Sequence, residues 1–140
     1  MKVKRLDHVN IRTPVFEESL RFYTEALGLR PGPMPGILQS PAGEAARGAW
    51  LYDASGCPIV HLIRAAPDTT LTATPASFDH LGLACEEPER YAEHLARLGI
   101  PVQRVAFPQY GILQLVVHDP NGIKIELAFG EPVSAIGANG

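Results

Sequence analysis

Apolar and polar side chains alternate at the start of the chain. The apolar positions are Val9 and Ile11, and the polar positions are His8, Asn10 and Arg12. A period of two residues is that of a β-strand, whose successive side chains point to opposite faces. We therefore expect a strand over residues 6–12 that presents the three polar side chains on one face.

A helical pattern follows this strand. Apolar side chains recur at intervals of four, three and four positions, at Phe16, Leu20, Tyr23 and Leu27, which places them on one side of a helix. Thr13 and Pro14 predict the start of the helix, as an N-cap and a first-turn proline. Gly28 predicts its end, because glycine readily adopts the left-handed conformation that follows many helices.

Strand patterns return after a loop. Residues 30–36 contain three prolines and two glycines, which predicts loop, and a short strand is expected over residues 37–40. Residues 50–52 and 59–63 then flank the turn sequence of residues 53–56. This arrangement predicts a β-hairpin.

The whole pattern occurs a second time. The matching stretches are Leu6-Asp7-His8-Val9-Asn10-Ile11 with Phe78-Asp79-His80-Leu81-Gly82-Leu83, and Leu27-Gly28-Leu29 with Leu98-Gly99-Ile100. The histidines at 8 and 80 are 72 positions apart, and the glycines at 28 and 99 are 71 apart. This nearly constant spacing indicates two copies of one unit.

The second copy predicts the same order of elements. We expect a strand over residues 78–85, a helix from Pro88, and strands over residues 102–107, 113–117 and 123–129. The helix has Tyr91, Leu95 and Leu98 on its buried side, and Asp119-Pro120-Asn121-Gly122 is a tight-turn sequence. Each copy therefore contains a strand, a helix and three strands, which makes an α+β fold of two βαβββ modules.

We expect one domain over residues 1–129. Its first module covers about residues 5–64 and its second about residues 78–129, and a Pro- and Thr-rich linker at about residues 65–77 joins them. Residues 130–140 contain three glycines and few groups that can pack. They predict a flexible C-terminal tail.

Composition limits the classes of function. The chain has 12 basic and 15 acidic side chains, interspersed in sequence, so it offers no basic stripe for nucleic acid. No apolar run approaches the roughly 20 residues that cross a membrane, and we expect a cytoplasmic protein with no membrane partner. Cys57 and Cys85 lack the spacing of a disulfide scaffold or a thiolate metal site and predict reduced thiols.

Four side chains that can bind metal take the same kind of position on their strands. In the last strand, Ile125 and Leu127 point to the helix side, which turns the glutamate between them to the opposite face. The same alternation places three histidines on the faces turned away from the helices. The four residues are His8, His61, His80 and Glu126.

These patterns resemble the vicinal oxygen chelate superfamily, which contains glyoxalases, bleomycin resistance proteins and extradiol dioxygenases. The resemblance covers about residues 5–129. The opening also resembles the glyoxalase I signature, at His8-Val9, Ile11, Ser19, Phe22-Tyr23 and Leu27-Gly28-Leu29. Thr13 and Glu18 depart from that signature, so membership of the superfamily does not by itself make the protein a glyoxalase.

The resemblance implies that the sheets of the two modules curl around a metal-binding cleft. It implies one divalent metal ion per site (Fe, Mn, Ni or Zn), with His8, His80 and Glu126 as ligands. Two imidazoles and one carboxylate leave coordination positions open for substrate or water. His61 takes the fourth position of the family and is a metal ligand, a general base or a spectator. The usual family arrangement also implies a homodimer.

The function implied by the resemblance is that of a glyoxalase-like metal-dependent lyase or isomerase. Its substrate is a small oxygenated organic molecule that chelates the metal through adjacent oxygens. Glu126 and His61 are the candidate catalytic residues, because both can transfer protons. Asn10, Arg12 and Lys124 share their face of the strands and are candidates for substrate binding.

Two alternatives stay open. One is a ring-cleaving dioxygenase of the extradiol type, although Val116 and residues 107–109 stand where that family has its tyrosine and histidine. The other is a bleomycin-resistance-type protein that sequesters a ligand without catalysis. Such proteins generally lack the metal ligands, so the two histidines and the glutamate count against it.

Overall fold

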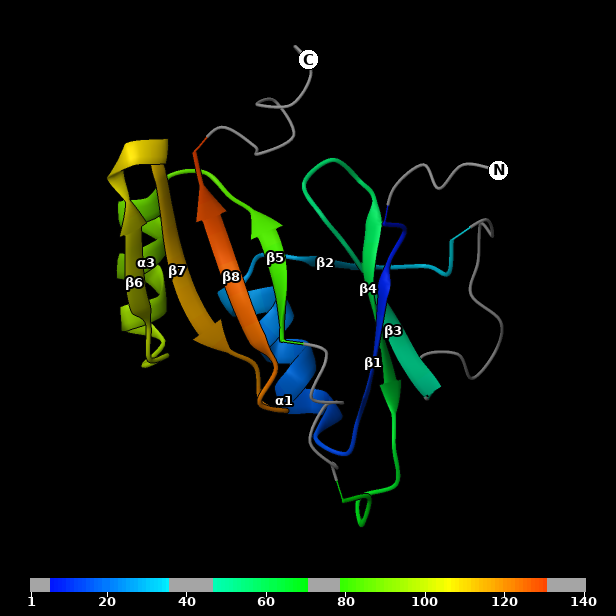
Figure 1. Ribbon diagram of the computed structural model, residues 1–140. Coiled ribbons are helices and arrows are strands. Elements are labelled where there is room, and N and C mark those ends of the chain that lie inside the picture. Colours follow the sequence, from blue (N-terminus) through cyan, green and yellow to red (C-terminus); the bar gives the residue numbers. More distant parts are fainter. Residues whose placement is uncertain (1–5, 36–46, 71–78, 131–140) are drawn as a thin grey trace. The chain divides into compact units, whose positions relative to one another are not determined.

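Two compact units make up the structure, a computed structural model that describes residues 6–35, 47–70 and 79–130. The units span Met1–Thr72 and Ala73–Gly140, and each contains one four-stranded mixed sheet (Figure 1). In each unit a strand and a helix precede three further strands. The predicted α+β class and the two βαβββ modules are therefore confirmed.

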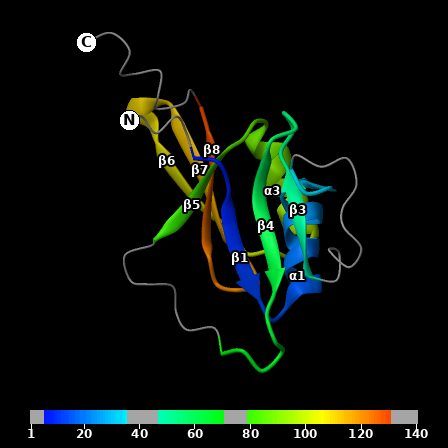
Figure 2. The same ribbon diagram turned by 90° about the vertical axis from the view of Figure 1, so that its right-hand side faces the viewer.

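The sheet of the first unit has the strand order β1-β4-β3-β2. Its strands are β1 (Val9–Thr13), β2 (Arg30–Gly32), β3 (Gly48–Tyr52) and β4 (Pro58–Arg64). The first and last of them pair in parallel and the other pairs are antiparallel, and Figure 2 shows β1, β4 and β3 side by side. Ile11, Leu51 and Leu62 are buried on one face of this sheet. Asn10 and Arg12 are exposed on the other, as the alternation predicts.

The first helix begins later than the sequence predicts. It consists of α1 (Phe16–Arg21) and a π-helical turn, η1 (Phe22–Ala26), and Val15 is the N-cap residue. Thr13 instead ends β1, where its hydroxyl accepts a hydrogen bond from the backbone N–H of Val15 (3.1 Å) and lies 3.2 Å from the Ser19 hydroxyl. The N-cap prediction was wrong because pairing with β4 holds Thr13 in the strand.

The predicted end of this helix is confirmed. The backbone N–H of Leu27 donates to the carbonyl of Phe22 (3.2 Å), five residues back, as in a π-helix. Gly28 follows with a φ of 75°, which glycine adopts without strain. Tyr23 and Ala26 are buried in this wide turn, and α1 packs on β4.

A short strand occupies part of the segment predicted as loop. β2 pairs antiparallel with β3, with Pro31 opposite Leu51. Proline is tolerated here because β2 is the edge of the sheet, where a missing N–H need not break a ladder. Gly32 lies under the Tyr52 ring, so closely that a Cβ would be 2.6 Å from the ring carbon Cε2. The loop prediction was wrong for residues 30–32, where strand pairing outweighed the local proline and glycine signals, and residues 33–35 are in neither a strand nor a helix.

The sheet of the second unit has the strand order β5-β8-β7-β6. Its elements are β5 (His80–Ala84), α3 (Pro88–Arg97), β6 (Gln103–Phe107), the short helix η2 (Pro108–Tyr110), β7 (Ile112–His118) and β8 (Lys124–Phe129). Again the first and last strands of the unit pair in parallel. α3 packs on β7, and Figure 1 shows it beside β6 and β7.

Burial in the second unit follows the predicted faces in the strands and partly in the helix. Ile125 and Leu127 of β8 are fully buried, with Glu126 on the opposite face. In α3, Leu95 is fully buried, but Leu98 is 43% exposed. The prediction for Leu98 was wrong because α3 ends at Arg97, one residue before it.

Several sequence predictions fall outside the described residues. They concern the strand over residues 37–40, the strand start at Phe78, the linker from residue 71 onward, and the tail from residue 131 onward. Among the helices that are described, none is long and apolar enough to cross a membrane.

Equivalent turns precede the last strand of each unit. In both, backbone hydrogen bonds join an aspartate N–H to the carbonyl four residues later, and a glycine N–H to the aspartate carbonyl. The residues are Asp53, Gly56 and Cys57 in the first turn, and Asp119, Gly122 and Ile123 in the second. The internal repeat therefore extends to the hydrogen bonds of the turns that lead into β4 and β8.

Replacing Asp119 by alanine is expected to lower the free energy of unfolding by about 2–3 kcal/mol. Its buried carboxylate accepts hydrogen bonds from the backbone N–H groups of Asn121 (2.8 Å) and Ile123 (2.9 Å), and alanine leaves both donors unsatisfied. Urea unfolding measures the change. Asp53→Ala is the matched control, with an expected loss of about 1 kcal/mol because water reaches that turn. Equal losses would contradict the role of burial.

Cys85, just beyond β5, is expected to be a slowly reacting thiol. Both cysteines are free, and burial raises the pKa of Cys85 from 9.0 to about 11, despite an opposing hydrogen bond with Tyr91. Because the thiolate is the reactive form, the rate of iodoacetamide alkylation in a Cys57→Ser variant should reach its half-maximum near pH 11. Below pH 9 the reaction should be about 100-fold slower than that of an ordinary thiol. A half-maximum near pH 9 would contradict the burial.

Candidate metal centre

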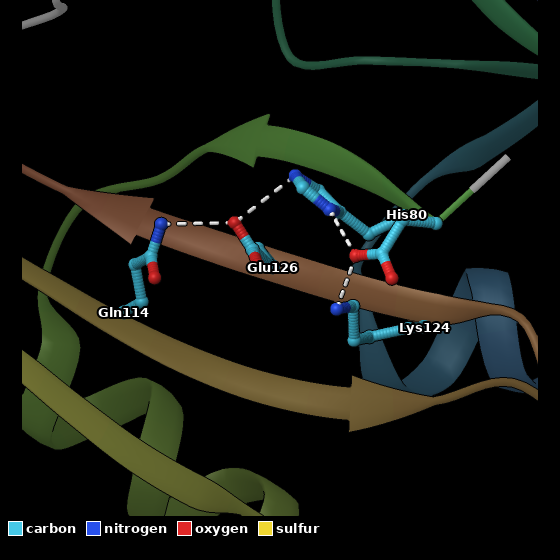
Figure 3. Close-up of polar contacts among 5 residues, drawn as sticks. His80, Gln114, Lys124 and Glu126 are labelled. Atoms are coloured by element: carbon cyan, nitrogen blue, oxygen red, sulfur yellow. Dashed lines mark hydrogen bonds and ion pairs between the residues drawn. The ribbon is translucent and has the colours of Figure 1, made fainter. Parts of the chain in front are cut away.

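Two of the predicted metal ligands lie together on the second sheet. His80 is the first residue of β5 and Glu126 the third residue of β8, and these strands pair in parallel with Gly82 opposite Glu126. The Nε2 atom of His80 lies 3.3 Å from Oε2 of Glu126 (Figure 3). Two donors that each lie about 2.0–2.2 Å from one ion are about 3.0–3.5 Å apart, so this pair fits adjacent positions on a metal.

The other nitrogen of His80 is held by the preceding residue. Oδ2 of Asp79 lies 2.8 Å from Nδ1 of His80, and the same oxygen forms an ion pair with Lys124. Lys124, first of all, and then His80 lower the pKa of Asp79 below its usual value. An ionised carboxylate only accepts hydrogen bonds. Nδ1 of His80 therefore carries the proton, and neutral His80 has its lone pair on Nε2, beside Glu126.

Glu126 is oriented from the opposite side. Gln114 on β7 donates a hydrogen bond through Nε2 to Oε2 of Glu126 (2.9 Å), as Figure 3 shows. The Glu126 side chain is 18% exposed, so it is half-buried but reachable. The second unit thus presents an imidazole nitrogen and a carboxylate whose orientations are fixed by Asp79 and Gln114.

The first unit repeats the aspartate–histidine contact. Oδ2 of Asp7 lies 2.9 Å from Nδ1 of His8, which corresponds to the contact between Asp79 and His80 in the second unit. By the same reasoning, the proton of neutral His8 is on Nδ1 and its lone pair is on Nε2. Asp7 breaks the alternation at the start of the strand, and this contact explains why a polar residue stands there.

His61 has different partners. It lies on β4 opposite Asn10 of β1 and Trp50 of β3. Nδ2 of Asn10 lies 3.0 Å from Nδ1 of His61, and the Trp50 ring stacks on the imidazole with ring centroids 4.1 Å apart and planes 9° apart. His8 meets the Trp50 ring edge-on at 4.8 Å and has its ring centroid 6.4 Å from that of His61. The first unit therefore places two imidazoles around one tryptophan.

The three predicted substrate-binding residues differ in their surroundings. Asn10 contacts His61, and Lys124 is paired with Asp79, so both are engaged with the histidines or their partner. Arg12 is exposed on β1, two residues beyond Asn10. No group of three or more His, Cys, Asp or Glu side chains is arranged to hold a metal within the part of the chain that the structure describes. What the structure brings together is the pair of His80 and Glu126, and the pair of His8 and His61.

Several residues of the site were not found from the sequence. Asp7 and Asp79 were visible as the residue before each histidine of the repeat, and their equivalence was the signal of a shared role. Gln114 reaches Glu126 from the neighbouring strand, and this contact depends on the pairing of β7 with β8. Trp50 stacks on His61 because the two residues lie opposite each other on β3 and β4.

Comparisons with known proteins identify the family of the chain. A model of the Glyoxalase/Bleomycin resistance protein/Dioxygenase superfamily matches residues 5–127. A protein of Arabidopsis thaliana named Glyoxylase I 4 is 32% identical over 128 residues, which cover 87% of this chain and 68% of that protein. The chain therefore belongs to the Glyoxalase/Bleomycin resistance protein/Dioxygenase superfamily, and the resemblance recognised in the sequence is confirmed.

Solved structures share the fold. A putative glyoxalase family protein from Bacillus anthracis matches with a TM-score of 0.66 and 22% identity, over 94% of this chain and 98% of that one. A glyoxalase/dioxygenase from Nostoc punctiforme matches with a TM-score of 0.69 and 17% identity, over 92% of each chain. The fosfomycin resistance protein FosX from Listeria monocytogenes matches with a TM-score of 0.66 and 11% identity, over 93% of this chain and 96% of that one. At these identities the likeness shows the fold alone.

Proposed function

We propose that the protein binds one divalent metal ion through His8, His80 and Glu126. We further propose that it is a glyoxalase-like lyase or isomerase acting on a small oxygenated molecule. The observation that carries the proposal is the pair of His80 and Glu126, whose donor atoms lie 3.3 Å apart with the imidazole proton directed to Asp79. Members of the superfamily generally use a divalent metal.

The aspartates support the choice of ligands. A histidine that binds metal almost always donates its second N–H to a carboxylate, a carbonyl or water, which orients the ring. His80 and His8 both have this carboxylate partner, Asp79 and Asp7. Two imidazoles and one carboxylate suit Fe, Mn, Ni or Zn and leave positions open. We propose that the protein is a homodimer. The three ligands can come from one chain or from both chains of this dimer.

A bound divalent ion would act as a Lewis acid that polarises the adjacent oxygens of the substrate. The chain's own residues then have separate tasks. Gln114 holds Oε2 of Glu126 in place, and Asp79 holds the His80 ring. Glu126 and His61 are the groups we assign to proton transfer, because carboxylates and imidazoles are common general acids and bases in enzymes. Arg12, exposed on β1, is the cation we assign to an anionic group of the substrate.

The binding part of this proposal is tested with acetohydroxamate, a small molecule that presents two adjacent oxygens. Isothermal calorimetry is expected to show binding to protein loaded with Zn, Ni, Mn or Fe, and none after chelation of the metal. Equal binding with and without metal would contradict a metal-chelated substrate.

The reaction class is tested with hydroxyacetone, which has a hydroxyl beside a carbonyl. A lyase or isomerase that moves a proton next to a carbonyl is expected to exchange the CH₂ protons of hydroxyacetone for deuterium in D₂O, in a metal-dependent way visible by proton NMR. Oxygen uptake with catechol in place of this exchange would favour the dioxygenase alternative. Metal-dependent ligand binding with neither reaction would favour the sequestering alternative.

A further inference from the structure

We propose that His61 is a hydrogen-bond donor that carries its proton on Nε2, fixed in this tautomer by Asn10, and that it is not a fourth metal ligand. This inference rests on the proposed metal site and assigns the residue at its fourth position. It separates the three site histidines by role: His8 and His80 bind the metal through Nε2, and His61 donates a hydrogen bond through Nε2.

The contact with Asn10 determines where the proton is. The side-chain nitrogen of Asn10 lies 3.0 Å from Nδ1 of His61. An amide nitrogen donates hydrogen bonds and does not accept them. Nδ1 of His61 must therefore supply the lone pair, and neutral His61 carries its proton on Nε2. An imidazole in this form uses its lone pair on Asn10 and has none to give to a cation.

In the other two histidines, Nδ1 faces a hydrogen-bond acceptor instead of a donor. Nδ1 of His8 faces Asp7 and Nδ1 of His80 faces Asp79, at 2.9 Å and 2.8 Å. A carboxylate takes a proton from Nδ1 and leaves Nε2 with the lone pair, which is the form that binds metal. The difference between an amide nitrogen and a carboxylate at Nδ1 therefore divides the imidazoles by role.

The position of the His61 ring is fixed as well as its proton. Asn10 and Trp50 are its direct neighbours on the strands to either side. The Trp50 ring lies nearly parallel to the imidazole at 4.1 Å, which holds the ring plane. Turning the ring by a half-turn would replace Nδ1 by a carbon atom opposite Asn10 and lose the hydrogen bond. Stacking and hydrogen bonding thus act together on one orientation.

The consequence is a metal site with three protein ligands. Three ligands leave more open positions than four, as in catalytic sites that admit substrate or water beside the metal. His61 contributes an Nε2–H group that can donate a hydrogen bond to an oxygen of the substrate. Its equivalent in the second unit, Glu126, lies beside Nε2 of His80 and is, with His80, one of the two ligands that we propose for that unit.

Nitrogen-15 NMR of metal-free protein labelled in its histidines tests the tautomers directly. Long-range proton–nitrogen spectra at about pH 8, above the ordinary imidazole pKa of about 6.5, are expected to show the proton of His61 on Nε2 and those of His8 and His80 on Nδ1. A proton on Nδ1 of His61 would overturn the inference. This measurement does not need bound metal. It can therefore support or overturn the tautomer of His61 even if the native protein binds no metal, the result that would contradict the proposed function.

The variant Asn10→Asp tests the cause. A carboxylate at this position accepts a proton from Nδ1, so His61 is expected to switch to the tautomer of His8 and His80 and to gain a lone pair on Nε2. Zinc affinity should then rise about 10-fold or more, which is within the range that partners of metal ligands exert. Asn10→Ala, the matched comparison, removes the hydrogen bond without supplying an acceptor, so it leaves the His61 tautomer unfixed and should raise zinc affinity less than Asn10→Asp does.

The variant His61→Gln tests the role of the ring. It is expected to leave zinc affinity within about threefold of the native value, because the ring is not a ligand. A fall of about 100-fold or more in His61→Gln, comparable with the loss of a ligand, would overturn the inference, as would an unchanged tautomer in Asn10→Asp.

Discussion

Replacing His80 by alanine is expected to remove stoichiometric metal binding. The imidazole provides one of three proposed ligands, and its Nε2 lies beside Oε2 of Glu126 (3.3 Å). Loss of a residue that only orients a ligand costs about 10–100-fold in metal affinity, so loss of the ligand itself should cost more than about 100-fold. Competition titration with a fluorescent zinc chelator measures the affinity of the native protein and the variant.

His118→Ala is the matched control for this experiment. His118 is an exposed imidazole at the end of β7, in the same unit and opposite Lys124. Its removal should leave zinc affinity unchanged, and both variants should unfold at nearly the same temperature, because neither imidazole is buried. If His80→Ala bound zinc as tightly as His118→Ala, then His80 would not be a ligand.

Replacing Leu127 by alanine is expected to lower the free energy of unfolding by about 2–5 kcal/mol. Leu127 is fully buried, on the face of β8 opposite the one that carries Glu126. Alanine in its place removes apolar contacts and leaves a cavity that neighbouring side chains fill incompletely. Urea unfolding followed by circular dichroism measures the change, and a fall of this size is a large share of the stability of a small domain.

Leu98→Ala is the control with the same chemical change at an exposed position. Leu98 is 43% exposed beyond the end of α3, so its loss should cost less than about 1 kcal/mol. Similar losses in the two variants would contradict the assignment of the core to the buried face of β8.

The strands of the fold were predictable because the alternation of apolar and polar residues predicts which face of each strand is buried. Ile11 and Leu127 are buried and Asn10 is exposed, as the period of two requires. The start of the first helix was not predictable in this way. Thr13 and Pro14 form a good local helix start, but pairing of β1 with β4 keeps Thr13 extended. Pairing between strands that are distant in sequence decided where the helix begins, and the local sequence signals give no information about that pairing.

The same distinction applies to the site. The repeat and the strand faces indicated His8, His80 and Glu126 as residues that point away from the helices. Their partners depend on which strands are neighbours. Lys124 stays a candidate for substrate binding, and its ion pair with Asp79 depends on the parallel pairing of β5 with β8, which sets it opposite His80. The register of the strands is therefore the information that the sequence lacked.

The metal content of the native protein tests the central claim most directly. Protein stripped with a chelator, refilled with Zn, Ni, Mn or Fe and freed of excess ions is measured by plasma mass spectrometry. The account predicts about one divalent ion per site for at least one of these metals. A native, folded protein that retains none of the four ions after refilling would contradict it.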